Sequence, residues 1–358
     1  LPISIRADGY DEEQLKNLSI IGPREKELLI RLQSISPILL EGIRGSGKTT
    51  LLKLAASSTN RPGAHQVAAY VSFNRYLLLE NPRIPIGPAH PFALWVSAKI
   101  LGAVYSAAKL VTGTNPNLPE LEPLLATSIE RIIKQLENTH DLAEDYPSPL
   151  SGLPQEVQDS LKAFQNPDKL KGLIETILSA FGLNSVNLLC DEAAQYFKPE
   201  FQPLFFSILK AIYAPNISFK VAIYPTVTYF GSDFELGHDA TIASITRPCL
   251  SRDWLDFCRG IMDKRSKDNS LWEKHDVIMQ SLSLAAFGIP RRFIELVGII
   301  DFSSINELEV LNIIKDHVQH ELFQPFDALK ARVPSLVREV ELANYLRHLF
   351  VEDLKHEN

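Results

Sequence analysis

Cysteine is scarce in this sequence. Its 358 residues include three cysteines, Cys190, Cys249 and Cys258, which lie far apart, and its nine histidines form no HxxxH pair. This spacing excludes a disulfide-stapled scaffold and gives no support to a structural metal site. We expect the cysteines to be small, buried, apolar residues of a protein in a reducing compartment.

Long apolar runs are lacking as well. A membrane-spanning helix needs roughly 20 consecutive apolar residues. The longest candidate, 92–111, is interrupted by Lys99 and Lys109 and predicts a core or partner-facing helix instead. The stretch "LPISIRADGYDEE" does not have the basic-then-apolar pattern of a secretion signal. We therefore expect a cytoplasmic protein with no membrane partner.

The sequence also lacks an excess of basic residues. The formal net charge of −7 argues against a chain that grips nucleic acid over its whole surface, although it leaves room for a local basic face. The chain is 45% apolar and longer than a typical domain. It can bury a large core, and we expect two domains.

Short apolar runs and helical periodicities alternate along much of the chain. Turn-bounded runs predict buried strands, and apolar residues at helical spacing predict the helices between them. The strands are expected at 37–42, 65–73, 218–227 and 240–246 and within 185–197, where the strand ends in two acids, and the helices at 22–35, 48–58 and 201–213. This alternation predicts an α/β fold, with a parallel sheet covered by helices on both faces.

Two regions depart from that alternation. Between about 75 and 183, a proline-rich loop precedes apolar helices near 92–112, 120–138 and 168–182, with a further loop at 145–154. We interpret this stretch as a helical insertion in the α/β core. Beyond 250 the pattern is helical to the end, which predicts an all-helical C-terminal domain over 251–358.

The segment "GIRGSGKT", residues 42–49, matches the pattern G-x-x-x-x-G-K-[ST] completely, and we call it the glycine loop. Glycines allow a tight turn that aims backbone N–H groups at an anion, and a following helix adds its positive end. Lys48 is expected to reach the β- and γ-phosphates of ATP, and the Thr49 hydroxyl to ligate Mg²⁺. The predicted nucleotide-binding residues are Gly42, Arg44, Gly45, Ser46, Gly47, Lys48, Thr49 and Thr50.

Two acids, Asp191 and Glu192, end the predicted strand "NLLCDE". An aspartate beside the glycine loop can hold hydrated Mg²⁺, and the next glutamate can polarise an attacking water. The alternative is a helix N-terminus with stabilising acids. The glutamate favours ATP hydrolysis over small-molecule kinase chemistry, and the lack of an NKxD-like segment disfavours a guanine-specific GTPase.

With these pieces in this order, the chain resembles the AAA+ ATPases, and among them the origin-recognition and initiator-like branch. The segment "IIGPREKELLIRL" is similar to the box that precedes the phosphate loop in that family, with Arg24 and Glu25 at its core. The resemblance implies that Arg24 helps to enclose the adenine. Residues 1–36 are then a linker and adenine-side segment, 37–250 the P-loop ATPase core and 251–358 the lid.

The resemblance also implies residues that sense the γ-phosphate. Thr226, in "VAIYPTV", falls at the tip of a strand where the family places a polar sensor, with Tyr224 as a competitor. The segment "FGIPRRFIEL" is similar to a second sensor that opens a lid helix. Arg291 would reach the phosphates from the lid, with Arg292 as the alternative.

A further implied residue is an arginine finger donated to the site of a neighbouring subunit. The segment "ITRPCLSRDW" supplies Arg247 as the first candidate and Arg252 as the second. The tail from 305 shows no paired-strand wing of the kind with which family members grip DNA. DNA is therefore a weaker expectation than self-association or a protein partner.

The sequence thus predicts a Mg²⁺-dependent AAA+ ATPase that couples its nucleotide state to the conformation of an oligomer, a partner or DNA. Defence against mobile elements is one role that fits by analogy with bacterial stand-alone relatives. The alternative is a signalling switch or scaffold that binds ATP and turns it over slowly. A helicase-like motor is disfavoured because no second motor core is found.

Overall fold

The computed structural model divides the chain into two units. One is Arg6–Arg247, and the other contains Pro248–Asn358. The division falls close to the boundary at 250 that the sequence predicts. The residues that the structure describes are 9–74, 91–121, 133–134, 155, 158–159, 166–193, 200–266, 268, 270–324 and 337–356.

A five-stranded sheet, all of whose pairs are parallel, forms the centre of the first unit in the described residues. Its order is β2-β3-β4-β1-β5, so β4 lies between β1 and β3. The strands are β1 (Ile38–Glu41), β2 (Gln66–Ser72), β3 (Ser185–Asp191), β4 (Ile217–Ile223) and β5 (Thr241–Ser244). The predicted α/β class, the strand positions and the parallel sheet are confirmed.

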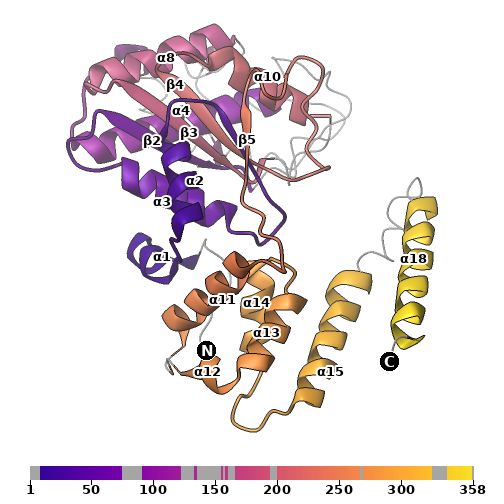
Figure 1. Ribbon diagram of the computed structural model, residues 1–358. Coiled ribbons are helices and arrows are strands. Elements are labelled where there is room, and N and C mark those ends of the chain that lie inside the picture. Colours follow the sequence, from indigo (N-terminus) through magenta and orange to yellow (C-terminus); the bar gives the residue numbers. More distant parts are fainter. Residues whose placement is uncertain are drawn as a thin grey trace. The chain divides into compact units, whose positions relative to one another are not determined.

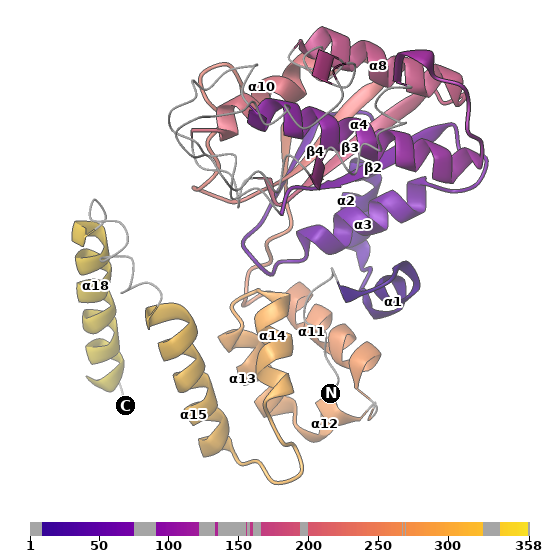
Figure 2. The ribbon, with the colours of Figure 1, turned by 180° about the vertical axis from the view of Figure 1, so that it is seen from behind.

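Helices cover both faces of this sheet (Figures 1 and 2). Alternate residues of each strand face opposite sides, so that Leu39 joins one apolar cluster while Ile38 and Leu40 join the other. One face packs against α2 (Pro23–Gln33) and α3 (Lys48–Thr59). The opposite face packs against α4 (Pro91–Thr112), α8 (Pro167–Ala180) and α10 (Gln202–Ile212). A short helix, α1 (Glu12–Leu18), precedes α2.

The helix α4 is long and apolar enough to cross a membrane by length and composition alone. Its side chains nevertheless pack in the core of the first unit, where Phe92 and Trp95 are fully buried and their rings lie 6.2 Å apart. Trp95 also meets Phe73, which follows β2, at 5.5 Å. This packing agrees with the expectation of a core helix.

The predicted helical insertion is described in part. Helices α4 and α8 confirm the predictions near 92–112 and 168–182, and a short 3₁₀ turn, η2, covers Pro119–Leu121. The proline-rich loop before residue 91 and the loop at 145–154 lie outside the described residues, as does most of the helix predicted at 120–138.

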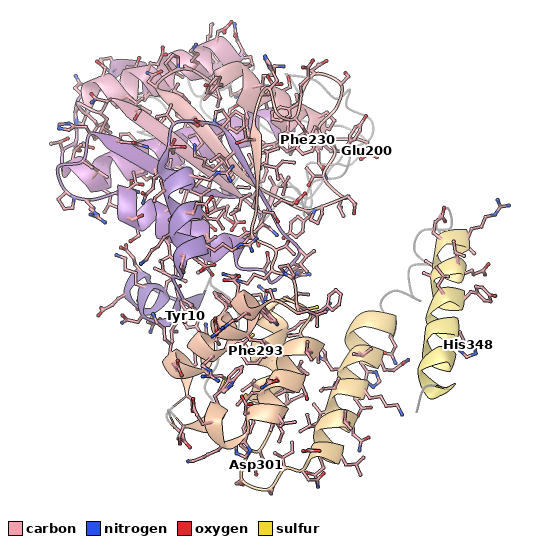
Figure 3. All side chains as sticks on the ribbon, viewed as in Figure 1. Tyr10, Glu200, Phe230, Phe293, Asp301 and His348 are labelled. Carbon is pink, nitrogen blue, oxygen red and sulfur yellow. The ribbon has the colours of Figure 1, made fainter. Side chains whose placement is uncertain are left out.

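The described part of the second unit is helical, as predicted. Its helices are α11 (Arg252–Arg265), α12 (Leu271–Lys274), α13 (Asp276–Ala285), α14 (Pro290–Gly298), α15 (Glu307–His317) with a π-helical continuation at Val318–Phe323, and α18 (Val337–His356). Phe293 of α14 is fully buried (Figure 3), and its ring lies 6.4 Å from that of Trp254 and 6.3 Å from that of Trp272. An aromatic cluster therefore holds α11, α12 and α14 together.

Candidate functional site

The glycine loop joins the end of β1 to the start of α3. Gly42 N–H donates to the carbonyl of Ile223, the last residue of β4, at 3.2 Å. A Cβ at Gly42 would lie 2.4 Å from Ile245 Cγ2 and 2.5 Å from Ser46 Oγ. Gly45 and Gly47 have φ angles of 85° and 100°, which favour glycine. The loop can close in this shape because glycine stands at all three positions.

The loop leads directly into the first turn of α3. Gly47 is the residue before the helix, and Lys48, Thr49 and Thr50 form its first turn, which contains no acidic side chain. The first N–H groups of a helix lack intrahelical acceptors and carry the positive end of the helix dipole. Within the described chain, Ser46 Oγ is buried without a hydrogen-bond partner. These features fit an anion such as a phosphate group.

Lys48 is buried beneath this loop. Its ammonium donates to the carbonyl of Gly42 and, at 3.1 Å, to that of Ile43. Nζ also lies 3.7 Å from the centre of the Tyr224 ring, a cation–π contact. Lys48 is therefore held at the end of the sheet by its own loop and by the residue that follows β4.

Asp191, the last residue of β3, lies beside the glycine loop. It is 2% exposed, and its carboxylate accepts hydrogen bonds from the Thr49 hydroxyl, from the Tyr70 hydroxyl at 2.9 Å and from Glu192 N–H at 2.9 Å. Burial raises the pKa of Asp191 above its ordinary value, while these bonds and the charge of Lys48 oppose that rise. The two predicted motifs thus meet through the Thr49–Asp191 bond.

Thr49 and Asp191 offer the donor set that a magnesium ion accompanying a nucleotide uses. Magnesium prefers oxygen ligands and keeps several waters, so one or two protein groups are sufficient beside substrate phosphates. In the described parts of the chain, no group of three or more His, Cys, Asp and Glu side chains is placed to hold a metal alone. A hydroxyl and a carboxylate beside a phosphate cradle therefore fit Mg²⁺ better than a metal held entirely by protein.

Glu192 lies immediately beyond β3 in a backbone conformation that a side-chain-bearing residue rarely adopts, with φ of 65°. Its carboxylate accepts a hydrogen bond of 3.0 Å from Ser72, the last residue of β2. Ser72 and Asp191 are partners in the β2–β3 register. The glutamate is thus directed by both its backbone and its neighbouring strand.

The residues that follow β4 lie between these two motifs in the strand order. Tyr224 contacts Lys48, whereas Thr226 is exposed in a turn with φ of 64°. The Thr228 hydroxyl bonds to both N–H and C=O of Tyr224 at 3.0 Å, which closes the turn. Beyond the turn, Phe230 packs on Phe206 of α10 with ring centres 4.7 Å apart (Figure 3). Of the two predicted sensors, Tyr224 is the one in contact with the glycine-loop lysine.

Arg24 and Glu25 are engaged at the end of β5. The Arg24 guanidinium donates to the carbonyls of Ser244 at 3.2 Å and Thr246 at 2.6 Å. Glu25 is buried, accepts from Gly22 N–H at 3.0 Å and forms an ion pair with buried Arg247. These contacts attach the start of α2 to the strand that lies beside β1.

The ion pair bears on the predicted arginine finger. Arg247 is 3% exposed and is paired within its own chain, so its guanidinium is not presented to a neighbouring subunit in this conformation. Arg252 has a side chain that is 94% exposed and lies 3.9 Å from Asp256. The geometry therefore favours the second candidate over the first.

Arg291 and Arg292 belong to the other unit. They lie in the first turn of α14, which begins with Pro290. Phe287, just before this helix, has φ of 53°. The expected contact of Arg291, or of Arg292, with the phosphates of the nucleotide stays a prediction.

Two site residues, Tyr70 and Ser72, were missed by sequence reasoning. Both are polar residues near the end of β2, and their hydroxyls bond to Asp191 and Glu192. The signal was present, since polar residues at the carboxyl end of a buried parallel strand face the edge where ligands bind. The sequence did not show that β2 lies beside β3.

Comparisons with known proteins found no relative. No protein-family model, no curated protein and no solved structure matches this chain.

Proposed function

We propose that this protein binds ATP with Mg²⁺ at the glycine loop and hydrolyses it. The observation that carries the proposal is the hydrogen bond between Thr49, at the start of α3, and Asp191, at the end of β3. It joins two motifs that are distant in sequence and that each fit the same ligand.

The glycine loop and the first turn of α3 would hold the β- and γ-phosphates through backbone N–H groups. Lys48 would exchange the carbonyls of Gly42 and Ile43 for phosphate oxygens, which are better acceptors for an ammonium because they carry charge. Thr49 and Asp191 would hold Mg²⁺, which supplies charge neutralisation for phosphoryl transfer. Further contacts to the nucleotide would come from Arg44, Ser46 and Thr50.

Glu192 is the proposed general base. Its carboxylate lies one residue beyond Asp191 and is oriented by Ser72. A carboxylate there can accept a proton from, or orient, a water that attacks the γ-phosphate. Removing its charge without changing its size should therefore stop turnover and leave nucleotide binding intact.

The AAA+ type is the finer part of the proposal. Tyr224 and Thr226 follow β4, which lies between β1 and β3, and we propose that this turn responds to the γ-phosphate. Arg291 from the lid and Arg252 from a neighbour would complete the charge around it. Loss of that phosphate would release these contacts and change the conformation of an oligomer, a protein partner or DNA.

A slow ATP-dependent switch or scaffold is the second candidate. It is favoured by the engagement of Lys48, whose ammonium is bonded to the carbonyls of its own loop. These bonds must be exchanged for phosphate contacts before catalysis, which would slow turnover.

Steady-state phosphate release from ATP tests these proposals, with and without DNA. We expect turnover by the wild-type protein, a loss of at least about a hundredfold in Glu192→Gln with ATP binding retained, and loss of both in Lys48→Ala. Tight binding that depends on Lys48 without phosphate release would support the switch. Wild-type protein that neither binds nor hydrolyses ATP would refute both.

A further inference from the structure

The proposed function leaves one side chain at the site without a role. Tyr70 lies on β2, two residues before its end, and its hydroxyl donates to Asp191 Oδ2 at 2.9 Å. Tyrosine is not needed there to satisfy the strand, whose backbone pairs with β3 in continuous parallel register from Gln66 to Ser72. The bond to Asp191 is therefore a contribution of the Tyr70 side chain that the pairing of β2 with β3 does not require.

Packing fixes the position of this hydroxyl. Tyr70 is half-buried against the apolar cluster on the α2–α3 face of the sheet, the face to which Leu189 also contributes. Lys53 of α3 places its ammonium 5.8 Å from the centre of the Tyr70 ring. The ring thus lies where α3 meets the sheet, and its oxygen reaches the end of the next strand.

The bond matters because it completes the support of a buried carboxylate. Asp191 Oδ1 accepts from Glu192 N–H at 2.9 Å, whereas Oδ2 accepts from Tyr70. Thr49 adds a third donor from the glycine-loop side. With a donor on each oxygen, the plane of the carboxylate is determined by β2 and β3 together. Groups that orient a metal ligand in this way typically change metal affinity 10- to 100-fold when removed.

We propose that Tyr70 is a positioning residue that orients Asp191 to receive the Mg²⁺ that accompanies the nucleotide. This inference rests on the proposed ATP site and names a determinant of its metal dependence. Tyr70 acts through Asp191 and takes no part in the cleavage itself. Its removal should therefore weaken the response to Mg²⁺ more than the binding of nucleotide without metal.

The test compares Tyr70→Phe with wild-type protein in binding titrations with a non-hydrolysable ATP analogue across Mg²⁺ concentrations. We expect the Mg²⁺ concentration that gives half of the metal-dependent gain in affinity to rise by about tenfold or more. Affinity for the analogue in EDTA should stay within about twofold of wild type. Rates of phosphate release should show the same shift in Mg²⁺ dependence, with recovery at high Mg²⁺.

Tyr105→Phe is the matched control. The Tyr105 hydroxyl also donates one hydrogen bond, to Asn115 Oδ1 at 2.7 Å, and lies on α4 rather than at the glycine loop. An equal shift in both variants, or no shift in Tyr70→Phe, would overturn the inference while leaving ATP binding by wild-type protein intact. Tyr70→Met is a second variant that fills similar space without a donor. If both Tyr70 variants lose analogue binding in EDTA, the role is structural and the inference is wrong.

The two failures can be distinguished. Wild-type protein that does not bind the analogue at any Mg²⁺ concentration refutes the proposed function. The role of Tyr70 alone is refuted if wild-type protein binds the analogue more tightly with Mg²⁺ and Tyr70→Phe shows the same Mg²⁺ dependence.

Discussion

Three residues in the described chain have positive φ although they are not glycine. They are Glu192, Thr226 and Phe287, with angles of 65°, 64° and 53°. Such conformations cost of order 1–3 kcal/mol and persist only where the surroundings hold them. Glu192 follows β3, Thr226 follows β4 and Phe287 precedes the helix that carries Arg291. Backbone strain therefore occurs in three of the segments for which the sequence predicts a function.

The burial of a lysine side chain is a second energetic cost at the scale of single residues. Lys220 of β4 is fully buried and donates to the carbonyl of Ser36 and, at 3.0 Å, to the hydroxyl of Ser218. Burial lowers the pKa of Lys220 from 10.5 to about 7 because the ammonium is removed from water. It has no place in the proposed mechanism.

The lowered pKa of Lys220 predicts how stability depends on pH. Between about pH 7 and pH 10 the unfolded lysine keeps its proton while the folded one has lost it, so stability rises with pH by up to about 1.4 kcal/mol per unit. Lys220→Met removes this contribution. Urea unfolding at pH 7, 8 and 9 measures both proteins. Equal slopes of free energy against pH in the two would contradict the prediction.

At the scale of elements, α2 covers the outer edge of the sheet. Among the described residues β5 pairs with β1 alone, and its outward carbonyls accept hydrogen bonds from two arginines of α2. Arg24 bonds to Ser244 and Thr246, and Arg31 bonds to Ile242 at 3.3 Å. Charged side chains over an edge strand oppose pairing with another chain. The predicted adenine-side box thus also has a structural use.

The Glu25–Arg247 pair attaches the same helix to the end of β5. Removing one partner of a buried ion pair leaves an uncompensated charge, and we expect Arg247→Met to destabilise the protein by about 3–5 kcal/mol. The double variant Glu25→Gln, Arg247→Met should recover most of that loss, because the glutamine still accepts from Gly22 N–H without carrying charge. Urea unfolding without nucleotide measures both. If Arg247→Met is as stable as wild type but loses turnover, Arg247 is an arginine finger after all.

At the scale of the whole molecule, the chain consists of an α/β unit that carries the glycine loop and a helical unit that carries Arg252 and Arg291. Under the proposed function, the helical unit would follow the nucleotide state of the α/β unit. The proposal that this protein self-associates has a direct consequence for Arg252, which is exposed and lies outside the α/β unit.

Self-association with an active site completed by a neighbour can be tested by complementation. Arg252→Ala should lower phosphate release by roughly a thousandfold, and Lys48→Ala should abolish it. A mixture of the two should regain activity, because the Lys48→Ala subunit can lend its Arg252 to an intact glycine loop next to it. Arg61→Ala, an exposed arginine in another loop, is the control and should keep full turnover. A mixture no more active than its components would exclude a shared site with Arg252.

Much of the fold could be predicted because its signals are local. Strand positions follow from short apolar runs between turn formers, and the glycine loop follows from residue types at fixed spacing. The role of Arg247 could not be predicted in this way, because its partner Glu25 lies on an element far away in the sequence. The same is true of the contact between Tyr224 and Lys48, which lie on segments far apart in the sequence.

Most strands and helices, their order along the chain and the residue types in "GIRGSGKT" and "LLCDE" can be recognised in the sequence, because periodicity, glycine and turn chemistry act between near neighbours. The position of β4 between β1 and β3 emerges from the folded chain, as do the hydrogen bonds from Tyr70 and Ser72 of β2 to Asp191 and Glu192. Strand order depends on how apolar faces are buried against helices that are distant in the chain. That burial is a property of the whole core, and no single segment encodes it.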